Sequence, residues 1–138
     1  MVKVLIVDDS ILVQQRLVDM LAEIDGIEVV GEAKDESEAL SKAIELIPDV
    51  IILDIRLREG NGINVLQKIK NNGANSTVVI IITSYPYPQY RERCVAAGAD
   101  FFFSKSTEFD KIPEVLKRLV IRSNSRGTDL ERTRKGVS

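Results

Sequence analysis

Two hydrophobic runs that end in carboxylates decide the fold: VKVLIVDD at residues 2–9 and VIILD at residues 50–54. Runs of β-branched and apolar residues are typical of buried parallel strands. If two such strands lie side by side, Asp8, Asp9 and Asp54 meet at one edge of the sheet. Like charges at that distance need a proton or a cation among them, and oxygen ligands favour a hard ion such as Mg²⁺. The sequence therefore predicts a site for a metal ion and an anion.

Composition limits the class of protein. The chain has 138 residues, 44% of them hydrophobic and 29% charged, which fits one compact domain. No apolar stretch approaches the roughly 20 residues that span a bilayer, and the first residues lack the pattern of a secretory peptide. We therefore expect a cytoplasmic protein without membrane contact. With one cysteine, Cys94, and no histidine, the sequence excludes an internal disulfide and a Cys-His nucleophile, and it argues against a zinc site.

Charge divides the chain into two unequal parts. The net charge is −2, but residues 122–138 hold five Lys or Arg against two acids, which leaves residues 1–121 at about −5. Recognition of a nucleic-acid backbone needs a clustered basic face, so we expect no nucleic-acid binding by the folded part. We expect residues 1–121 to form the domain and residues 122–138 to form a flexible, polar and basic tail or linker.

Apolar runs alternate with segments of helical periodicity along the whole domain. Five strands separated by five helices predict an α/β fold with a parallel sheet, right-handed crossovers and helices on both faces. The expected strands are Val2–Val7, Ile27–Val30, Val50–Leu53, Val78–Ile82 and Ala99–Phe103. The expected helices follow Ser10, begin at Asp35 and stop at Pro48, span Asn61–Asn71 and end at Asn72-Gly73, span Pro88–Gly98, and begin near Glu108.

Chemically apt side chains follow four of these strands. Open sheets of this class bind ligands beyond the carboxyl ends of their strands. There, Asp54 is a candidate nucleophile that forms an acyl phosphate, Thr83 offers a hydroxyl, and Lys105 offers a positive charge. Each residue also has a structural explanation. A helix dipole favours an acidic pair such as Asp8 and Asp9, and Asp54 fits a turn. The Thr83 hydroxyl fits a turn or a cap, and Lys105 fits a solvated surface. Their coincidence at separate strand ends favours a site.

The chain resembles the receiver domain of two-component response regulators over residues 1–121. The motifs that carry the resemblance are KVLIVDDS at residues 3–10, PDVIILD at 48–54 and AAGAD at 96–100. The resemblance implies a flavodoxin-like, doubly wound sheet with strand order 2-1-3-4-5. It also implies a signalling module, not a conventional enzyme, that catalyses its own Mg²⁺-dependent phosphorylation and dephosphorylation.

The resemblance also assigns roles to individual residues. Thr83 and Phe102 correspond to the switch hydroxyl and the switch aromatic. The alternative for Phe102 is that Phe101-Phe102-Phe103 simply fills the core, with alternation putting two of the rings on one side of a buried strand. Bulky Tyr85 is expected to shield the acyl phosphate, or alternatively to pack the loop. The implied assignments are: phosphoacceptor Asp54; phosphoryl-binding Lys105; Mg²⁺ ligands Asp8, Asp9, Asp54 and the backbone carbonyl of Arg56; residues that tune the phosphoryl lifetime, Arg56 and Tyr85.

The partners implied are those of a phosphorelay. A sensor histidine kinase or a phosphotransfer protein would donate the phosphoryl group. The fourth helix, fifth strand and fifth helix would form the output face, for a downstream protein or, in a longer regulator, for the chain's own effector domain. Residues 122–138 are too few for a DNA-binding domain, and a homodimer on phosphorylation is an open alternative.

Three positions depart from the family pattern. Arg58 stands where many members have proline, so we expect a more mobile loop. Ser106 follows Lys105 where many members have a cis proline, and a cis bond there would cost about 3–4 kcal/mol, which leaves its geometry open. The stiff segment YPYP at residues 85–88 is expected to restrict the loop after Thr83.

Three other functions fit the pattern less well. A Mg²⁺-dependent phosphatase typically carries a second acid two residues after its nucleophile, where this chain has Arg56. A flavin-binding domain needs a loop that cradles phosphate after the first strand, where Asp8 and Asp9 would repel it. A degenerate receiver that only binds partners requires the loss of a site residue, and none is missing.

Overall fold

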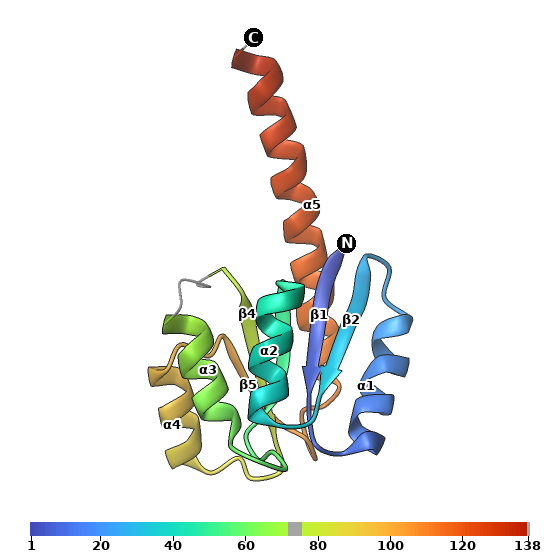
Figure 1. Cartoon of the computed structure of the whole chain (residues 1–138). Coiled ribbons are helices and arrows are strands. Elements are labelled where there is room, and N and C mark those ends of the chain that lie inside the picture. The colour runs from blue at the N-terminus through green and yellow to red at the C-terminus, as the bar shows by residue number, and fades with distance from the viewer. Residues whose placement is uncertain (72–75, 138) are drawn as a thin grey trace.

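The chain folds into alternating strands and helices. The computed structural model describes residues 1–71 and 76–137, and the side chains of residues 125–137 are outside that description. The elements are β1 Val2–Val7, α1 Ile11–Ala22, β2 Ile27–Ala33, α2 Glu36–Leu46, β3 Val50–Asp54, α3 Gly62–Asn71, β4 Val78–Thr83, α4 Pro88–Ala96, β5 Phe101–Ser104 and α5 Lys111–Val137 (Figure 1).

The five strands form one parallel sheet in the order β2-β1-β3-β4-β5, which confirms the predicted fold class and strand order. Register brings the functional ends of the strands to one level. Val7 pairs with Leu53, so the next residues, Asp8 and Asp54, lie at the same height on neighbouring strands. Thr83 pairs with Ser104, the residue before Lys105. The parallel register therefore collects side chains from four strands at one edge.

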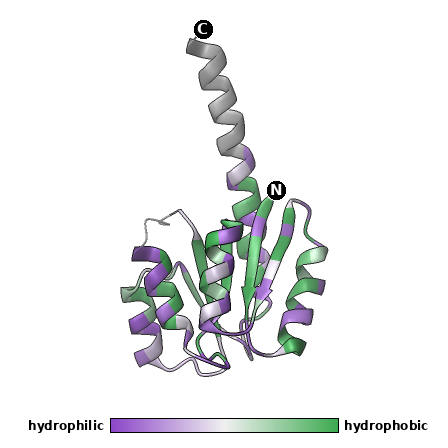
Figure 2. Ribbon diagram, viewed as in Figure 1, coloured by the Kyte–Doolittle hydropathy of each residue, from purple (hydrophilic) through white to green (hydrophobic). Residues whose placement is uncertain are grey.

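Each face of the sheet carries its own apolar layer. Alternate residues of one strand face opposite layers, as Ile52 and Leu53 do in β3. The first layer packs against α1 and α5, and the second packs against α2, α3 and α4, where Cys94 is fully buried. Burial on both faces explains why the central strands are apolar almost throughout (Figure 2).

The predicted helix starts are confirmed by their caps. The Ser10 hydroxyl accepts a hydrogen bond from the backbone N–H of Val13 at 3.3 Å, and the Asp35 carboxylate accepts one from Glu38 at 2.8 Å. Both bonds satisfy donors that a helix N-terminus would otherwise leave unpaired. Pro88 is the first residue of α4, where the missing N–H costs nothing.

The last helix begins three residues after the predicted start, and no end was predicted for it. It begins at Lys111, not near Glu108, because the Glu108 carboxylate accepts a hydrogen bond from the backbone N–H of Ser104 at 3.1 Å and belongs to the preceding turn. It continues to Val137, through residues expected to form a flexible tail, and projects beyond the body of the domain (Figure 1). No proline follows Pro113, and extending an existing helix costs less than starting one. The predicted stop of α3 at Asn72-Gly73 lies outside the described residues.

No helix in the described part of the chain combines the length and apolar character that a membrane span needs.

Gly62 sets a test of how closely α3 packs on the end of β3. A Cβ atom at this position would lie 1.9 Å from the backbone oxygen of Asp54, and backbone cannot rotate away. We expect Gly62→Ala to lower the free energy of unfolding by about 2–3 kcal/mol in urea denaturation. Gly31→Ala is the control, because its Cβ would come closest, at 2.7 Å, to the terminal methyl group of Leu46, which can rotate. Equal losses for the two variants would contradict this account.

Candidate functional site

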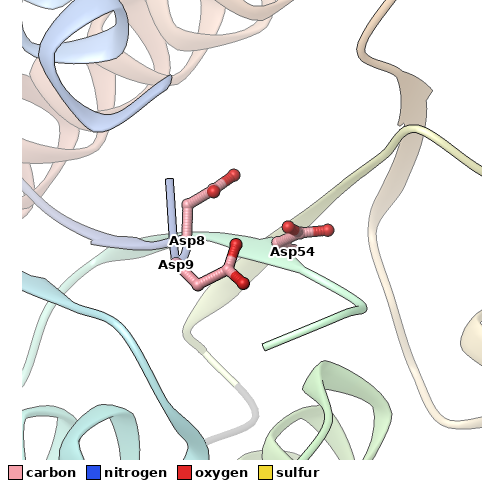
Figure 3. Close-up of side chains that lie close together, drawn as sticks. All are labelled: Asp8, Asp9 and Asp54. Atoms are coloured by element: carbon pink, nitrogen blue, oxygen red, sulfur yellow. The ribbon is translucent and has the colours of Figure 1, made fainter. Parts of the chain in front are cut away.

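Three carboxylates converge at the carboxyl edge of the sheet, as predicted. Asp8, Asp9 and Asp54 each contribute an oxygen to a cluster in which these atoms lie within 4.8 Å of one another (Figure 3). Asp8 and Asp54 are buried, whereas Asp9 is exposed. The cluster therefore has two fixed acids and one that is open to solvent.

Asp8 is held by hydrogen bonds on both sides. Its Oδ1 accepts a bond from the backbone N–H of Ser10 at 2.8 Å. Its backbone carbonyl accepts a bond of 2.6 Å from Nε2 of Gln14, which also donates to the carbonyl of Ala33 at 3.1 Å. Buried Gln14 thus joins the ends of β1 and β2. The sequence analysis missed this residue, whose signal is a polar side chain on the stripe of α1 that also carries Leu17 and Leu21.

Lys105 lies between the two buried acids. Its ammonium donates a hydrogen bond to Oδ2 of Asp54 at 2.9 Å and lies 2.6 Å from Oδ2 of Asp8. The second contact is an ion pair without hydrogen-bond geometry, so among the described residues the buried Asp8 Oδ2 has no hydrogen-bond partner. The backbone N–H of Lys105 donates to the carbonyl of Thr83 at 2.8 Å, which fixes the start of the lysine side chain.

Burial and charge oppose each other at this cluster. Burial raises the pKa of Asp54 to about 6, and the hydrogen bond and charge of Lys105 only partly offset this rise. Burial by itself would lower the pKa of Lys105, but its contacts with Asp54 and Asp8 outweigh that effect and raise it. Near neutral pH the site therefore holds an ionised Asp54 beside a charged lysine.

The donor set fits a hard divalent cation. Three carboxylates against one ammonium leave an excess of about two negative charges when all are ionised. All donors are oxygens, and Asp8 Oδ2 is buried without a hydrogen bond. These are the features that Mg²⁺ requires of a protein site.

Thr83 and Phe102 lie on neighbouring strands, β4 and β5, and alternation turns both toward the same face of the sheet. Thr83 is buried at the end of β4, and its hydroxyl accepts a hydrogen bond from the backbone N–H of Tyr85 at 2.9 Å. Phe102 is buried in the layer beneath α2, α3 and α4. Phe101 and Phe103 stack on the other face, with ring centroids 5.9 Å apart. The predicted alternation is confirmed, while the switch roles of Thr83 and Phe102 stay predictions.

Arg56 and Tyr85, the two residues expected to tune the phosphoryl lifetime, contact each other. The Arg56 guanidinium carbon lies 4.0 Å from the centroid of the Tyr85 ring. This cation–π contact joins the loop after β3 to the loop after β4. The sequence analysis placed both residues near the site but did not predict the contact between them.

The loop after β3 is attached to the start of α2. The Glu36 carboxylate accepts hydrogen bonds from the backbone N–H of Asn61 and from the side chain of Asn64, both at 3.2 Å. The backbone N–H of Glu36 donates to the carbonyl of Glu59 at 3.0 Å. These bonds hold the loop where the family pattern would have proline in place of Arg58. The greater mobility expected for this loop stays a prediction.

The bond between Lys105 and Ser106 is trans, because no peptide bond in the described part of the chain is cis. Ser106 turns the backbone by donating its N–H to the hydroxyl of Ser104 at 3.3 Å.

The raised pKa of Asp54 predicts that its charged form lowers the free energy of unfolding, by an amount that depends on pH. Its pKa is about 6 in the fold against 3.8 for an ordinary aspartate, so this cost is absent below pH 3.8 and complete above pH 6. Without metal, Asp54→Asn should therefore raise the free energy of unfolding at pH 8 by about 1–3 kcal/mol, and this gain should vanish near pH 4. Urea denaturation in a chelator at both pH values measures it. Asp25→Asn, at an exposed turn, is the control and should show no such gain.

Comparisons with known proteins agree on one family. Residues 4–117 match the model of the response regulator receiver domain. Over 117 residues the chain is 33% identical to response regulator GacA of Pseudomonas syringae pv. syringae (strain B728a). The aligned region covers 85% of this chain and 54% of GacA. The chain thus spans about half the length of the curated relatives it matches.

Solved structures give the same result. The response regulator domain of Thermotoga maritima CheB is 34% identical with a TM-score of 0.75, and the match covers 88% of this chain and 94% of that one. CheY in the CheX-CheY-BeF3-Mg complex from Borrelia burgdorferi has 28% identity and a TM-score of 0.73, with 83% and 88% covered. Because the family match covers most of the sequence and the acidic cluster lies at the predicted edge, the chain belongs to the response regulator receiver domains, which are signalling modules of two-component systems and not conventional enzymes.

Proposed function

We propose that this receiver accepts a phosphoryl group on Asp54, in the cytoplasm, from a sensor histidine kinase or a phosphotransfer protein. The observation that carries the proposal is the Lys105 ammonium, 2.9 Å from Asp54 and 2.6 Å from Asp8. An ionised carboxylate is a competent nucleophile only if its surroundings also bind the incoming negative charge. Lys105 can bind that charge without losing its place beside Asp54.

Asp8, Asp9 and Asp54 would hold Mg²⁺, together with the backbone carbonyl of Arg56. Bound there, the ion would supply positive charge that offsets the carboxylates and attracts the incoming phosphoryl group. Support comes from the all-oxygen donor set and from the buried Asp8 Oδ2, which has an ion pair with Lys105 but no hydrogen bond among the described residues. The Borrelia burgdorferi CheY complex contains Mg²⁺ and BeF3.

In the proposed transfer, a carboxylate oxygen of Asp54 attacks the phosphorus of a phosphohistidine. An O–P bond forms and the P–N bond breaks, with its electron pair left on the imidazole, which solvent then protonates. Lys105 keeps its protons and donates hydrogen bonds to the phosphoryl oxygens. The Thr83 hydroxyl accepts from Tyr85 through its oxygen, so its hydrogen can be donated to the phosphoryl group.

Phosphorylation would then switch an output face. The new group adds about −1.5 to −2 charges and three acceptor oxygens beside Thr83. Movement of Thr83 would change the packing around Phe102, whose ring lies 5.6 Å from the guanidinium carbon of Arg91 on α4. The face formed by α4, β5 and α5 would bind a downstream protein, an effector domain of a longer regulator, or a second copy of the chain.

Incubation with Mg²⁺ and acetyl phosphate tests the acceptor. We expect the intact mass to rise by one phosphoryl group in the wild type and in the control Asp25→Asn, and to stay unchanged in Asp54→Asn. Without Mg²⁺ the mass of the wild type should also stay unchanged, because the carboxylate cluster then repels the donor. A phosphoryl group on Asp54→Asn would disprove the assignment.

Tyr85 is expected to protect the acyl phosphate from water. Tyr85→Ala removes the ring on which Arg56 stacks. We expect the phosphoryl lifetime to shorten by about threefold or more, which corresponds to roughly 0.6 kcal/mol in the barrier. The time course of the intact mass after acetyl phosphate is removed, with Mg²⁺ still present, measures it. Tyr87→Ala removes a neighbouring exposed ring that is not stacked on Arg56, and should leave the lifetime unchanged. A lifetime unaffected by Tyr85→Ala would leave the tyrosine a packing residue only.

A further inference from the structure

A cavity of about 350 Å³ lies beside the site, between the loop after β3 and the start of α4. Its floor is apolar and includes Ile55 and Ile63. Its rim carries Arg56, Tyr85, Tyr90 and Arg93, and one wall is Thr83. We call it the basic cavity, because two of its lining residues are arginines and none is an acid.

The two arginines of the basic cavity have no partner of opposite charge. Among the residues whose side chains are described, neither Arg56 nor Arg93 has a carboxylate within 4.0 Å, whereas Lys42, Lys68, Lys70, Lys105 and Lys111 all do. Arg56 is held against Tyr85 by stacking alone. In a domain of about −5 overall, this cavity is a local concentration of unpaired positive charge. Its potential therefore favours an anionic ligand.

The shape of the basic cavity favours a side chain of a protein over a free small molecule. Arg56, Tyr85 and Arg93 are exposed, so the rim is open to solvent and cannot enclose a small ligand as a buried pocket does. Guanidinium groups at the rim bind carboxylates in a fork geometry, and the floor offers apolar contact. A carboxylate next to an aliphatic side chain matches both features.

We propose that the basic cavity binds an acidic segment of a partner protein, with a carboxylate on Arg56 and Arg93 and an adjacent aliphatic side chain on the apolar floor. This surface is distinct from the output face of α4, β5 and α5, because half of it comes from the loop after β3. It shares Thr83 and Arg56 with the phosphoryl site, so the partner would bind within reach of that site.

The chain contains its own reporter for this surface. It has three tyrosines and no tryptophan, and all three tyrosines lie in residues 85–90. Tyr85 and Tyr87 have ring centroids 6.3 Å apart, and Tyr87 and Tyr90 have centroids 6.0 Å apart. Tyrosine fluorescence therefore reports on residues 85–90, of which Tyr85 and Tyr90 line the basic cavity.

The test titrates the unphosphorylated full chain with a blocked pentapeptide that has two aspartates flanking a leucine between terminal alanines. We expect a change in tyrosine fluorescence with a dissociation constant of about 1 mM or tighter. Arg93→Gln should weaken binding by about fivefold, the scale of one exposed ion pair. Arg58→Gln is the matched control, because it removes the same charge from an exposed arginine that does not line the cavity, and should bind like the wild type.

Several results would overturn the proposal: no binding, equal binding of the peptide with asparagines in place of the aspartates, or equal binding by Arg93→Gln. Saturation by acetate or inorganic phosphate at the same concentration would make this a site for small anions and would also overturn it. Because the protein is unphosphorylated in this experiment, its outcome is independent of whether Asp54 accepts a phosphoryl group.

Discussion

The ammonium of Lys105 between two buried carboxylates is the interaction on which the rest of the site depends. Burial makes the charge of Asp54 costly enough to raise its pKa to about 6, and the lysine offsets only part of that cost. Removing Lys105 would leave two buried carboxylates without their cation, which costs about 3–5 kcal/mol. The fold therefore allows Asp54 to ionise, but its charged form is unfavourable. A bound cation, or a modification that changes the charge of Asp54, lowers the free energy of the folded protein.

Only a sheet with matched strand ends can build this arrangement. Asp54 is the last residue of β3, and Asp8 follows β1 at the same height, because the two strands pair without a shift. A slip of one residue would turn every side chain to the other face and move the carboxylates apart. Gly62 adds a second constraint, since its backbone lies against the carbonyl of Asp54 too closely for any side chain. Backbone contacts thus fix the positions of Asp8 and Asp54 at this edge of the sheet, so their carboxylates remain available to bind a ligand.

Periodicity and capping residues in the sequence predicted the strands, the helix starts and the edge at which the site forms. The apolar runs gave the strands, the caps at Ser10 and Asp35 gave helix starts, and shared strand ends predicted that Asp54 and Lys105 meet. Other features depend on contacts between distant residues, which periodicity does not encode. The hydrogen bonds of Gln14 to Asp8 and Ala33 form only because β2 runs beside β1. The contact of Arg56 with Tyr85 depends on how the loops after β3 and β4 lie relative to each other. The end of α5 was not predicted, because the polar residues 122–138 contain no proline to stop a helix and no apolar periodicity to support one.

The end of β4 links the carboxylate cluster to the surface. The carbonyl of Thr83 accepts a bond from Lys105, and its hydroxyl accepts one from Tyr85, so a single residue contacts both the cluster and the next loop. Tyr85 in turn contacts Arg56, which lies two residues after Asp54. These contacts form a closed ring of residues around the site. An exposed cation–π contact contributes about 0.5–1 kcal/mol, which is too little to lock the two loops and enough to bias their positions. A phosphoryl group at Asp54, whose hydrogen bonds are charge-assisted and stronger, can therefore outweigh this contact and rearrange the ring.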